Sequence, residues 1–357
     1  MRKSRIILLL GIAAAGFFWA AVGWAEEFPN LYRGVRPLGM GGAFITLSDD
    51  ENAMFYNPAG LNDVSGFGGV GLINPLAEIS ENTKDLYQDI KDLKTNDPAA
   101  VSDFLSKRVG EHQHLRAALL PNLVVHNFAI GVLGQATADL EVRNRSNPEV
   151  LTNMRMDTGL FASLAYGFWD KKLQVGVTGK YVQREGVNRV YTAVDIAQPD
   201  GFDPLDQKKK ESDIAFDLGA KMNFQAPLRP TLGVVVQNVT GLDFKVLGKM
   251  SQQVNVGVAI NPDFWILKTT FAVQVDDVTK KVGADKDLSK RTRLGAEFRF
   301  PKVLALRVGL NGGYPSAGVG IDLWILSISY ATYAEELGAF AGQRADRRHV
   351  AQLSLGF

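Results

Sequence analysis

The sequence contains no cysteine and only four histidines among its 357 residues. Without cysteine there are no disulfide bridges, no thiolate metal sites and no lipid attached to an N-terminal cysteine. A metal site would have to rely on histidine, and the closely spaced pair, His112 and His114, reads as an incidental exposed pair. We therefore expect neither a metal ion nor a cofactor.

The sequence also lacks an excess of either charge. It has 39 Lys and Arg against 38 Asp and Glu, for a formal net charge of +1. Arg2, Lys3 and Arg5 precede the first apolar run, and without these three basic residues the net charge is −2. A chain so balanced gives no support to nucleic-acid binding.

Long apolar runs are missing everywhere except at the N-terminus. There Ile6 to Val22 is apolar, and Gly23-Trp24-Ala25 supplies the small residues of a cleavage site. This pattern predicts a secretory signal peptide, residues 1–25, cleaved after Ala25. No later stretch approaches the roughly 20 continuous apolar residues of a membrane-spanning helix.

What the sequence does contain is alternation with a period of two. In the segment 213–224, one face would be apolar and the other wet, as side chains alternate along a strand. The same alternation recurs at 252–261, 291–300 and 303–312. A composition that is 46% hydrophobic, with mean hydropathy near zero, fits strands with one face toward lipid and one toward water. The apolar face of the first segment comprises Ile214, Phe216, Leu218, Ala220, Met222 and Phe224.

Fourteen such segments run from residue 66 to the C-terminus, and the connections between them alternate between long and short, with the link 313–314 as the one exception. In a soluble β-sandwich, nothing requires long and short loops to alternate along the chain. The rhythm predicts an all-β fold: a 14-stranded antiparallel transmembrane β-barrel, monomeric and surrounded by outer-membrane lipid, in the outer membrane of a two-membrane bacterium. The predicted strands are 66–74, 114–124, 127–142, 154–168, 172–186, 211–224, 231–239, 252–261, 264–277, 290–300, 303–312, 315–325, 326–335 and 347–357.

The segment before the barrel, residues 26–65, does not read as a membrane strand. Ser48 followed by Glu51 is a capping-box pattern, which predicts a short helix from Asp49 to Tyr56. Asn57-Pro58 would end it, because proline disfavours helical geometry in the preceding residue. The glycine-rich run 39–42 has neither the ending of a phosphate loop nor the spacing of a dinucleotide fingerprint.

Two motifs in this segment, LGMGGAF at 38–44 and NAMFYNPAGL at 52–61, resemble the N-terminal region of FadL-type outer-membrane transport proteins. They are equally similar to the related PorV-type and conjugation-associated barrels. The resemblance implies a 14-stranded barrel, residues 66–357, with residues 26–65 folded inside it as a hatch. The turn at Asn57 and Pro58 would belong to that plug, and Gly39, Gly41 and Gly42 would let the backbone pass close to the wall.

The resulting functional hypothesis is passive uptake of hydrophobic or amphipathic small molecules, resembling long-chain fatty acids, past a hatch. Phe44, Phe55 and Tyr56 are the candidate ligand path, although anchoring the plug is the competing role. A PorV-like component of a protein secretion or surface-attachment system is the main alternative, and a sealed structural barrel is a third. No enzyme activity is expected, since His349 and Ser354 lie on opposite strand faces and no other wall histidine lies near a serine.

The long extracellular loop, 75–113, is predicted to carry two amphipathic helices. Leu86, Ile90 and Leu93 share a helical face after Ser80, and Phe104 lies on the apolar side of a second helix that starts at Asp97-Pro98. These residues are a candidate site for capturing a hydrophobic ligand at the barrel mouth. In the competing interpretation, the helices only pack on the rim and on each other.

The inward faces of the strands carry charged residues, which in a lumen must pair or stay hydrated. Two interpretations are open: ion pairs that hold the hatch, or guidance of the polar head of an amphipathic ligand. The set comprises Asp157, Lys180, Asp217, Lys221, Arg293, Glu297, Arg299, Arg307 and Asp322.

The last strand ends on Phe357, which resembles the signal by which the outer-membrane barrel assembly machinery recognises its substrates. Deleting Phe357 should lower the yield of folded, heat-modifiable barrel in outer membranes, because recognition of the last strand would weaken. The measurement is the gel shift between unheated and heated samples. An unchanged folded yield would contradict the assembly role.

Overall fold

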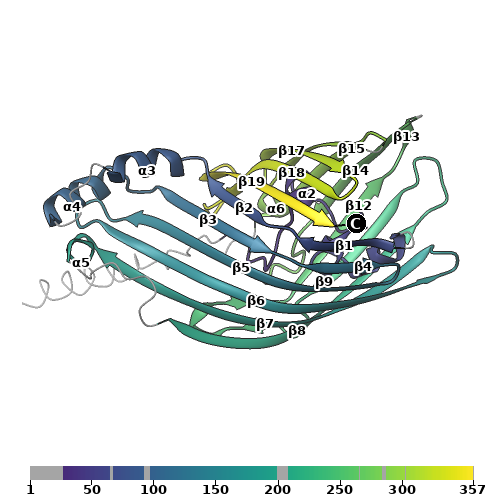
Figure 1. The fold of residues 1–357 in the computed structure, drawn as a ribbon, viewed down its shortest axis with the longest axis horizontal. Coiled ribbons are helices and arrows are strands. Elements are labelled where there is room, and N and C mark those ends of the chain that lie inside the picture. Colours follow the sequence, from purple (N-terminus) through teal and green to yellow (C-terminus); the bar gives the residue numbers. More distant parts are fainter. Residues whose placement is uncertain are drawn as a thin grey trace, which may run out of the picture.

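The computed structural model describes residues 27–64, 67–91, 97–198, 208–264, 266–283, 287–301 and 303–356. The predicted signal peptide, residues 1–25, and Phe357 lie outside the described residues. Figure 1 shows antiparallel strands that form an elongated barrel, with helices at the end where the connections are long. We call the two ends the long-loop rim and the short-turn rim.

Within the described chain, fourteen antiparallel wall strands close into one barrel, as the alternation predicted. Three of them are each divided into two segments. Closure occurs where the last strand pairs with both segments of the first. In order, the wall consists of β1 Phe67–Ile73 with β2 Leu76–Ser80, β3 His112–Leu119 with β4 Asn122–Val125, β5 Phe128–Arg143, β6 Glu149–Phe168, β7 Leu173–Thr192, β8 Lys209–Asn223, β9 Thr231–Gln237, β12 Gln253–Ile260 with β13 Asp263–Phe264, β14 Leu267–Val275, β15 Thr292–Arg299, β16 Leu304–Asn311, β17 Tyr314–Leu323, β18 Leu326–Glu336 and β19 Ala345–Gly356.

The first wall strand is longer than predicted. It continues past Asn74 to Ser80, because Pro75 interrupts the ladder without ending the strand. Pro121 interrupts the neighbouring strand at the same level, and proline cannot donate a ladder hydrogen bond. The Asn74 side chain fills the gap: its Oδ1 accepts from Leu120 N at 2.7 Å and its Nδ2 donates to Leu120 O at 2.5 Å. The two strands therefore bend together and stay paired.

Strands β6 and β7 also exceed their predicted lengths, with 20 residues each. The connection predicted as a long loop at 143–153 is only the short turn between Arg143 and Glu149. Polar residues of that segment continue the ladder, so the loop rhythm is weaker in the structure than in the sequence. The Gly312-Gly313 turn stays short, as expected, and both its glycines have positive φ.

Exposure alternates as the strand parity predicted. Phe216 and Leu218 are 46% and 50% exposed, whereas Asp217 and Lys221 are 1% and 3% exposed. Exposed aromatic side chains also gather at the short turns, which is where a membrane interface places them. These are Trp169, Phe224, Phe264, Phe300 and Trp324. An apolar outer face, an aromatic girdle and a closed antiparallel wall place the barrel in the outer membrane.

Two residues of the predicted inward set differ from the rest. Asp322 is exposed, and Ser327 Oγ donates to it at 2.6 Å near the short-turn rim. Arg299 is only partly buried, with 40% of its side chain exposed. Both lie near strand ends, where the lumen opens to solvent.

The remaining elements lie at the long-loop rim or in the N-terminal segment. No helix in the described ranges is long and apolar enough to cross a membrane. The rim carries α3 Thr83–Lys91, α4 Pro98–Ser106, α5 Ala193–Ala197, α6 Leu288–Arg291, η3 Lys245–Leu247, β10 Leu242–Asp243 and β11 Lys249–Met250; the N-terminal segment carries α2 Val35–Gly39, η1 Glu51–Met54 and η2 Pro58–Asp63.

Placing a charge on the outer face tests this register. Leu218→Arg should lower the free energy of unfolding by roughly 2–4 kcal/mol, because a lipid-facing arginine near the membrane midplane is poorly solvated. Phe224→Arg, on the same face at the short-turn rim, should cost only about 0–1 kcal/mol. Urea unfolding in lipid vesicles measures both. Equal costs at the two positions would show that the register is wrong.

Candidate functional site

Residues 27–64, which we call the luminal segment, lie inside the wall and are mostly buried. Helix α2 packs against β16, β17 and β18, whereas η2 packs against β6, β7 and β8. The segment therefore touches strands that are far apart around the barrel, and Figure 1 shows it in purple among the yellow and green strands. Any molecule that crosses the lumen must pass it.

The predicted glycines lie where this segment meets the wall backbone. A Cβ on Gly39 would be 3.1 Å from Gly318 Cα. A Cβ on Gly41, which has φ +63°, would be 2.6 Å from the carbonyl oxygens of Leu294 and Leu310. Gly42, with φ +85°, has more room, because its nearest neighbour would be Arg293 Cδ at 3.5 Å. Gly41 is therefore the position of the three least able to accept a side chain.

Hydrogen bonds from wall side chains hold the segment's backbone. Gln274 Oε1 accepts from the amides of Phe44 at 2.9 Å and Ile45 at 3.1 Å. On the other side, Lys221 Nζ donates to Leu47 O at 3.0 Å and pairs with Asp63 at 2.6 Å. These bonds satisfy buried backbone groups in a stretch with little regular structure.

The turn at Asn57 and Pro58 fits against two wall glycines. A Cβ on Gly219 would be 2.0 Å from Asn57 Oδ1, and one on Gly176 would be 2.5 Å from Pro58 C. Asn57 caps η2 by accepting from Ala59 N at 3.1 Å and donates from Nδ2 to Ile45 O at 2.9 Å. This asparagine thus joins the two arms of the luminal segment.

The helix predicted at Asp49–Tyr56 is shorter and differently capped. It is a single 3-10 turn, η1, and its cap is Asp50, whose Oδ1 accepts from Asn52 N at 2.9 Å. The predicted Ser48 cap is wrong: Ser48 has φ +38°, and its hydroxyl donates back to Phe44 O at 2.8 Å. Pro58 does not follow the helix directly but starts η2.

An arginine on α2 is the main electrostatic anchor near the short-turn rim. Arg36 forms a two-pronged pair with Glu297, with both N–O distances 2.9 Å. Its Nη1 also reaches Asp49 at 2.6 Å and Asp50 at 2.7 Å, and its guanidinium lies 4.9 Å from the centre of the Phe44 ring. Bidentate, charge-assisted bonds of this kind are among the stronger polar interactions in proteins.

A second charged cluster surrounds the start of the segment. Arg33 pairs with Glu27 and Glu335, and Arg348 Nη2 reaches Glu27 at 2.8 Å. Burial raises the pKa of Glu27, but the guanidinium groups of Arg348 and Arg33 outweigh it and hold the pKa well below its usual range. Glu27 is therefore ionised across the physiological range.

The two histidines belong to this cluster. The sequence suggested an exposed pair, but His114 is 4% exposed and its Nδ1 lies 2.6 Å from Asp139. His112 Nδ1 lies 3.1 Å from Asp346. Among the described residues, no group of three or more acidic or histidine side chains could hold a metal ion. The pair instead helps to satisfy luminal carboxylates.

The candidate path residues differ in their surroundings. Phe44 is fully buried with Met40, Ala43 and Leu47 in a small core that includes Ala272 of the wall. Phe55, by contrast, stacks between Tyr32 and Phe161, with both ring centroids at 4.8 Å. Tyr56 meets the Phe44 ring edge-on at 5.4 Å. The structure thus places Phe44 within the segment's own core and Phe55 on the wall.

The cavity beside these rings is small. It is lined by Tyr32, Phe55 and Tyr56 together with wall amides such as Gln253 and Asn255, and its volume is about 40 Å³. That is space for one or two water molecules, and far less than a drug-sized ligand occupies. Passage would therefore require the luminal segment or its neighbours to move.

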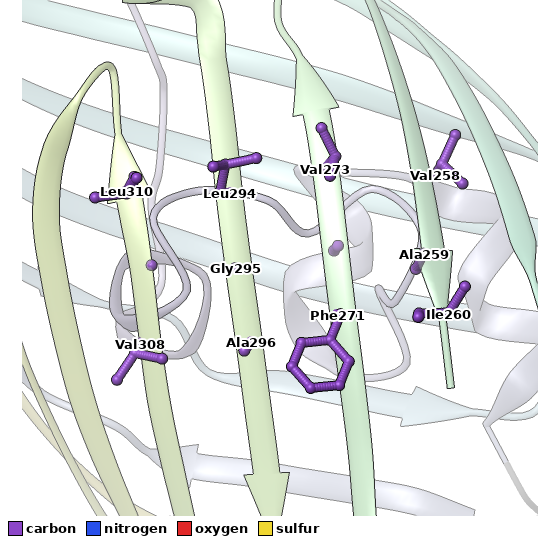
Figure 2. A pocket seen from close by; sticks show the side chains of 12 residues that line it. Val258, Ala259, Ile260, Phe271, Val273, Leu294, Gly295, Ala296, Val308 and Leu310 are labelled. Carbon is purple, nitrogen blue, oxygen red and sulfur yellow. The ribbon is translucent and has the colours of Figure 1, made fainter. Parts of the chain in front are cut away.

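Larger hollows lie elsewhere. A polar vestibule of about 770 Å³ opens at the short-turn rim, between wall residues and Arg36, Asp49 and Asp63. An apolar groove of about 560 Å³ lies over β12, β14, β15 and β16, where Figure 2 shows outward-pointing side chains such as Leu294 and Phe271. This groove faces lipid and does not belong to the path.

Of the four predicted capture residues, the structure describes the side chains of Leu86 and Phe104. Leu86 is partly buried, and the side chains of Ile90 and Leu93 lie outside the described residues. Phe104 is partly buried beneath Arg108, whose guanidinium lies 4.9 Å from the ring centre. Val101 and Leu105, on the same helix, pack against Val150 and Ala193. The apolar face of α4 is therefore covered by α5 and the wall.

Sequence reasoning missed the connection between β9 and β12. The predicted strands leave residues 240–251 as a long connection without further structure, yet Leu242 and Phe244 are fully buried and Met250 is 4% exposed. All three join the apolar cluster that contains Tyr32, Phe55 and Phe161. The signal in the sequence was the number of large apolar residues in this connection, which include Leu242, Phe244, Leu247 and Met250.

The luminal segment contains one carboxyl with an unusual affinity for protons. Burial raises the pKa of Glu51 from 4.5 to about 7, and the adjacent Asp50 carboxylate adds to the shift. Because the folded state holds this proton more tightly than the unfolded state, stability falls as pH rises from about 4.5 to about 7.

Glu51→Gln should therefore stabilise the protein at pH 8, by roughly 2–3 kcal/mol, and have little effect near pH 4. Urea unfolding at the two pH values measures the difference. Glu81→Gln, which changes an exposed glutamate of the long-loop rim, should show no such pH dependence. Equal effects of Glu51→Gln at both pH values would contradict the shifted pKa.

No protein-family model matches this sequence, and no curated protein sequence matches it either. Among solved structures, the CymD monoaromatic hydrocarbon channel aligns with 92% of this chain and 98% of its own, with 13% identity and a TM-score of 0.50. The toluene transporter TbuX of Ralstonia pickettii aligns with 91% and 98%, with the same identity and TM-score. At this identity the likeness concerns architecture, and the chain has the fold of the FadL-type outer-membrane transport proteins.

Proposed function

We propose that this barrel mediates passive uptake of hydrophobic or amphipathic small molecules across the outer membrane, with the luminal segment as a movable hatch. The observation that carries the proposal is a continuous apolar cluster inside an otherwise polar lumen. It joins Leu31 and Tyr32 of the segment to Phe161 and Val182 of the wall and to Phe244 of the β9–β12 connection. Such a column favours apolar solutes by partition and disfavours hydrated ions.

The contacts that hold the segment support its ability to move. Several of them are hydrogen bonds to single wall side chains, such as Gln274 and Lys221. Water can replace the partners of a polar contact at small net cost, since an intramolecular hydrogen bond contributes about 1 kcal/mol net. Displacement of the hatch therefore exchanges partners one by one. The driving force would be the ligand's own concentration gradient.

The proposal extends to substrate and assembly. The structural neighbours are named as a hydrocarbon channel and a toluene transporter, which favours compact apolar ligands alongside fatty-acid-like ones. The barrel would work as a monomer without catalysis, inserted by the barrel assembly machinery. Phe55 and Tyr56 would contact the ligand, whereas Phe44 would anchor the hatch.

One observation favours the PorV-like alternative. Helices α4 and α5 pack on each other and on Val150 in a separate apolar cluster at the long-loop rim. A rim with its own core is a defined surface on which a secreted protein can dock. Cross-linking from exposed Asp103 of α4 to co-purifying proteins would reveal such a partner.

The glycine that touches the wall backbone provides the test. Gly41→Leu should leave the barrel folded but displace the hatch, because its side chain would collide with the carbonyls of Leu294 and Leu310. Uptake of radiolabelled toluene and leakage of a small polar dye should both rise several-fold in vesicles. Gly134→Ala, whose added methyl meets nothing within 4 Å, is the matched control.

Deleting residues 28–60 should make the barrel permeable to small polar solutes. The hatch proposal would be abandoned if this deletion leaves the barrel folded with polar-solute leakage at background. The transport proposal would be abandoned if the wild-type protein adds nothing to toluene or fatty-acid entry into vesicles.

A further inference from the structure

The connection between β9 and β12, residues 238–252, folds back over the lumen, and we call it the inward loop. Its hydrophobic residues Leu242, Phe244 and Met250 are buried, whereas its tip at Lys245 and Val246 is exposed. Strand β9 is only 7 residues long, while the adjacent β8 has 15. The loop therefore lies beside a taller wall, against the inner faces of β7 and β8.

Phe244 occupies a specific slot on that wall. Its ring centre lies 4.4 Å from the Arg184 guanidinium, and the ring is fully buried. Arg184 is held flat by a two-pronged pair with Asp157 of β6, at 2.6 Å and 2.9 Å. Arg184 also donates from Nη1 to Leu247 O of the inward loop, at 3.3 Å. A guanidinium fixed in this way presents a planar face to a ring.

The inward loop forms a cover on the aromatic stack of the hatch. Phe244, Leu242 and Met250 belong to one apolar cluster with Phe161 and Phe55. The stack is thus enclosed between the luminal segment on one side and the inward loop on the other. A ligand arriving from the long-loop rim would meet the inward loop before it meets the hatch.

The loop has internal hydrogen bonds of its own. It has its own small ladder, with Leu242 opposite Met250 and Asp243 opposite Lys249, closed by a bond from Phe244 N to Gly248 O at 3.0 Å. Glycines with positive φ stand at its two bends, Gly241 at +74° and Gly248 at +98°. At its base, Asn238 is tied to the wall through Lys180 and Asp217. Rotation above this base would lift the Phe244 ring and keep the ladder intact.

We propose that the inward loop is a ligand-displaced lid, and that the slot vacated by Phe244 over Arg184 takes a planar apolar ring of the ligand. This inference rests on the proposed uptake function and adds a second gate and a ligand subsite to it. The phenyl ring of Phe244 acts as the chain's own occupant of that subsite when no ligand is present. Uptake then needs two displacements, first of the lid and then of the hatch.

Locking the lid tests the gate. Asp243 N lies 2.7 Å from Asp213 Oδ2, so cysteines at these two positions can be joined by a short bis-methanethiosulfonate reagent. The chain has no cysteine of its own, so the introduced pair is unique. We expect cross-linked Asp213→Cys/Asp243→Cys protein to lose at least about four-fifths of its toluene uptake into vesicles, and dithiothreitol to restore it. Asp213→Cys alone, treated identically, is the control.

The subsite is tested with two ligands of similar size, of which only one has an aromatic ring. The wild-type protein should prefer toluene over methylcyclohexane, which has similar size but no aromatic face. In Arg184→Gln/Asp157→Asn, a neutral hydrogen-bonded pair replaces the buried ion pair, so that neither charge is left unpaired. We expect this variant to fold and its ratio of toluene uptake to methylcyclohexane uptake to fall by about 2- to 10-fold, as expected for the loss of a cation–π contact.

The outcomes distinguish the two levels. If the wild-type protein takes up neither probe, the uptake function itself is wrong. If it takes up both and the cross-linked pair does so equally well, the lid is wrong while the uptake function stands. If the lock blocks uptake but the neutral pair keeps the full preference for toluene, the loop gates the lumen and the Arg184 subsite is overturned.

Discussion

Buried polar groups on the inside of the wall need partners, and the rest of the structure follows from how they are supplied. A closed sheet satisfies its own backbone, but its inward side chains point into a confined lumen. Some of these partners are other side chains, and others are backbone groups of the luminal segment: Arg116 donates to Arg33 O, Gln135 to Leu31 O and Lys221 to Leu47 O. The wall and the luminal segment therefore satisfy each other's polar groups, although the described part of the segment, residues 27–64, adds no strand to the sheet.

The same arrangement separates two kinds of contact. Polar contacts, such as those of Gln274 and Arg36, lie where the segment meets the wall. Apolar contacts run through the middle, from Tyr32 past Phe55 and Phe161 to Phe244. Polar contacts fix position because they are directional, and apolar contacts tolerate sliding and exchange because they are not. The two kinds of contact thus involve different residues of the segment.

Much of this architecture was predictable from the sequence. Alternation fixed the faces of β8, β15 and β16, because a lipid-facing strand tolerates little that is polar, and Phe216 and Asp217 indeed point in opposite directions. The motifs around Gly41 and Asn57 indicated a resemblance to FadL-type proteins, but they did not indicate which wall residues contact the luminal segment. Partners such as Gln274 and Lys221 lie far away in sequence, and their pairing depends on the barrel's circumference.

The errors have physical causes as well. The first strand was predicted to end at residue 74, but it continues beyond Pro75. The side chain of Asn74 replaces the missing ladder bond, and this long-range bond leaves no local pattern in the sequence. Ser48 has the sequence of a cap but lies in a left-handed conformation, where its hydroxyl turns back to Phe44. The inward loop was predicted only as a long connection, because the strand pattern alone does not indicate that Leu242, Phe244 and Met250 are buried.

The wall strands of this barrel differ greatly in length. Strand β6 has 20 residues, which at about 3.3 Å per residue and a tilt of about 45° rise roughly 47 Å along the membrane normal. The apolar belt of an outer membrane barrel is only about 25 Å tall, so about 20 Å of this strand stands clear of the hydrocarbon. Figure 1 shows α4 and α5 at the far end of that extension. The long-loop rim therefore stands high on the β6–β7 side and low at β9, where the strand has only 7 residues.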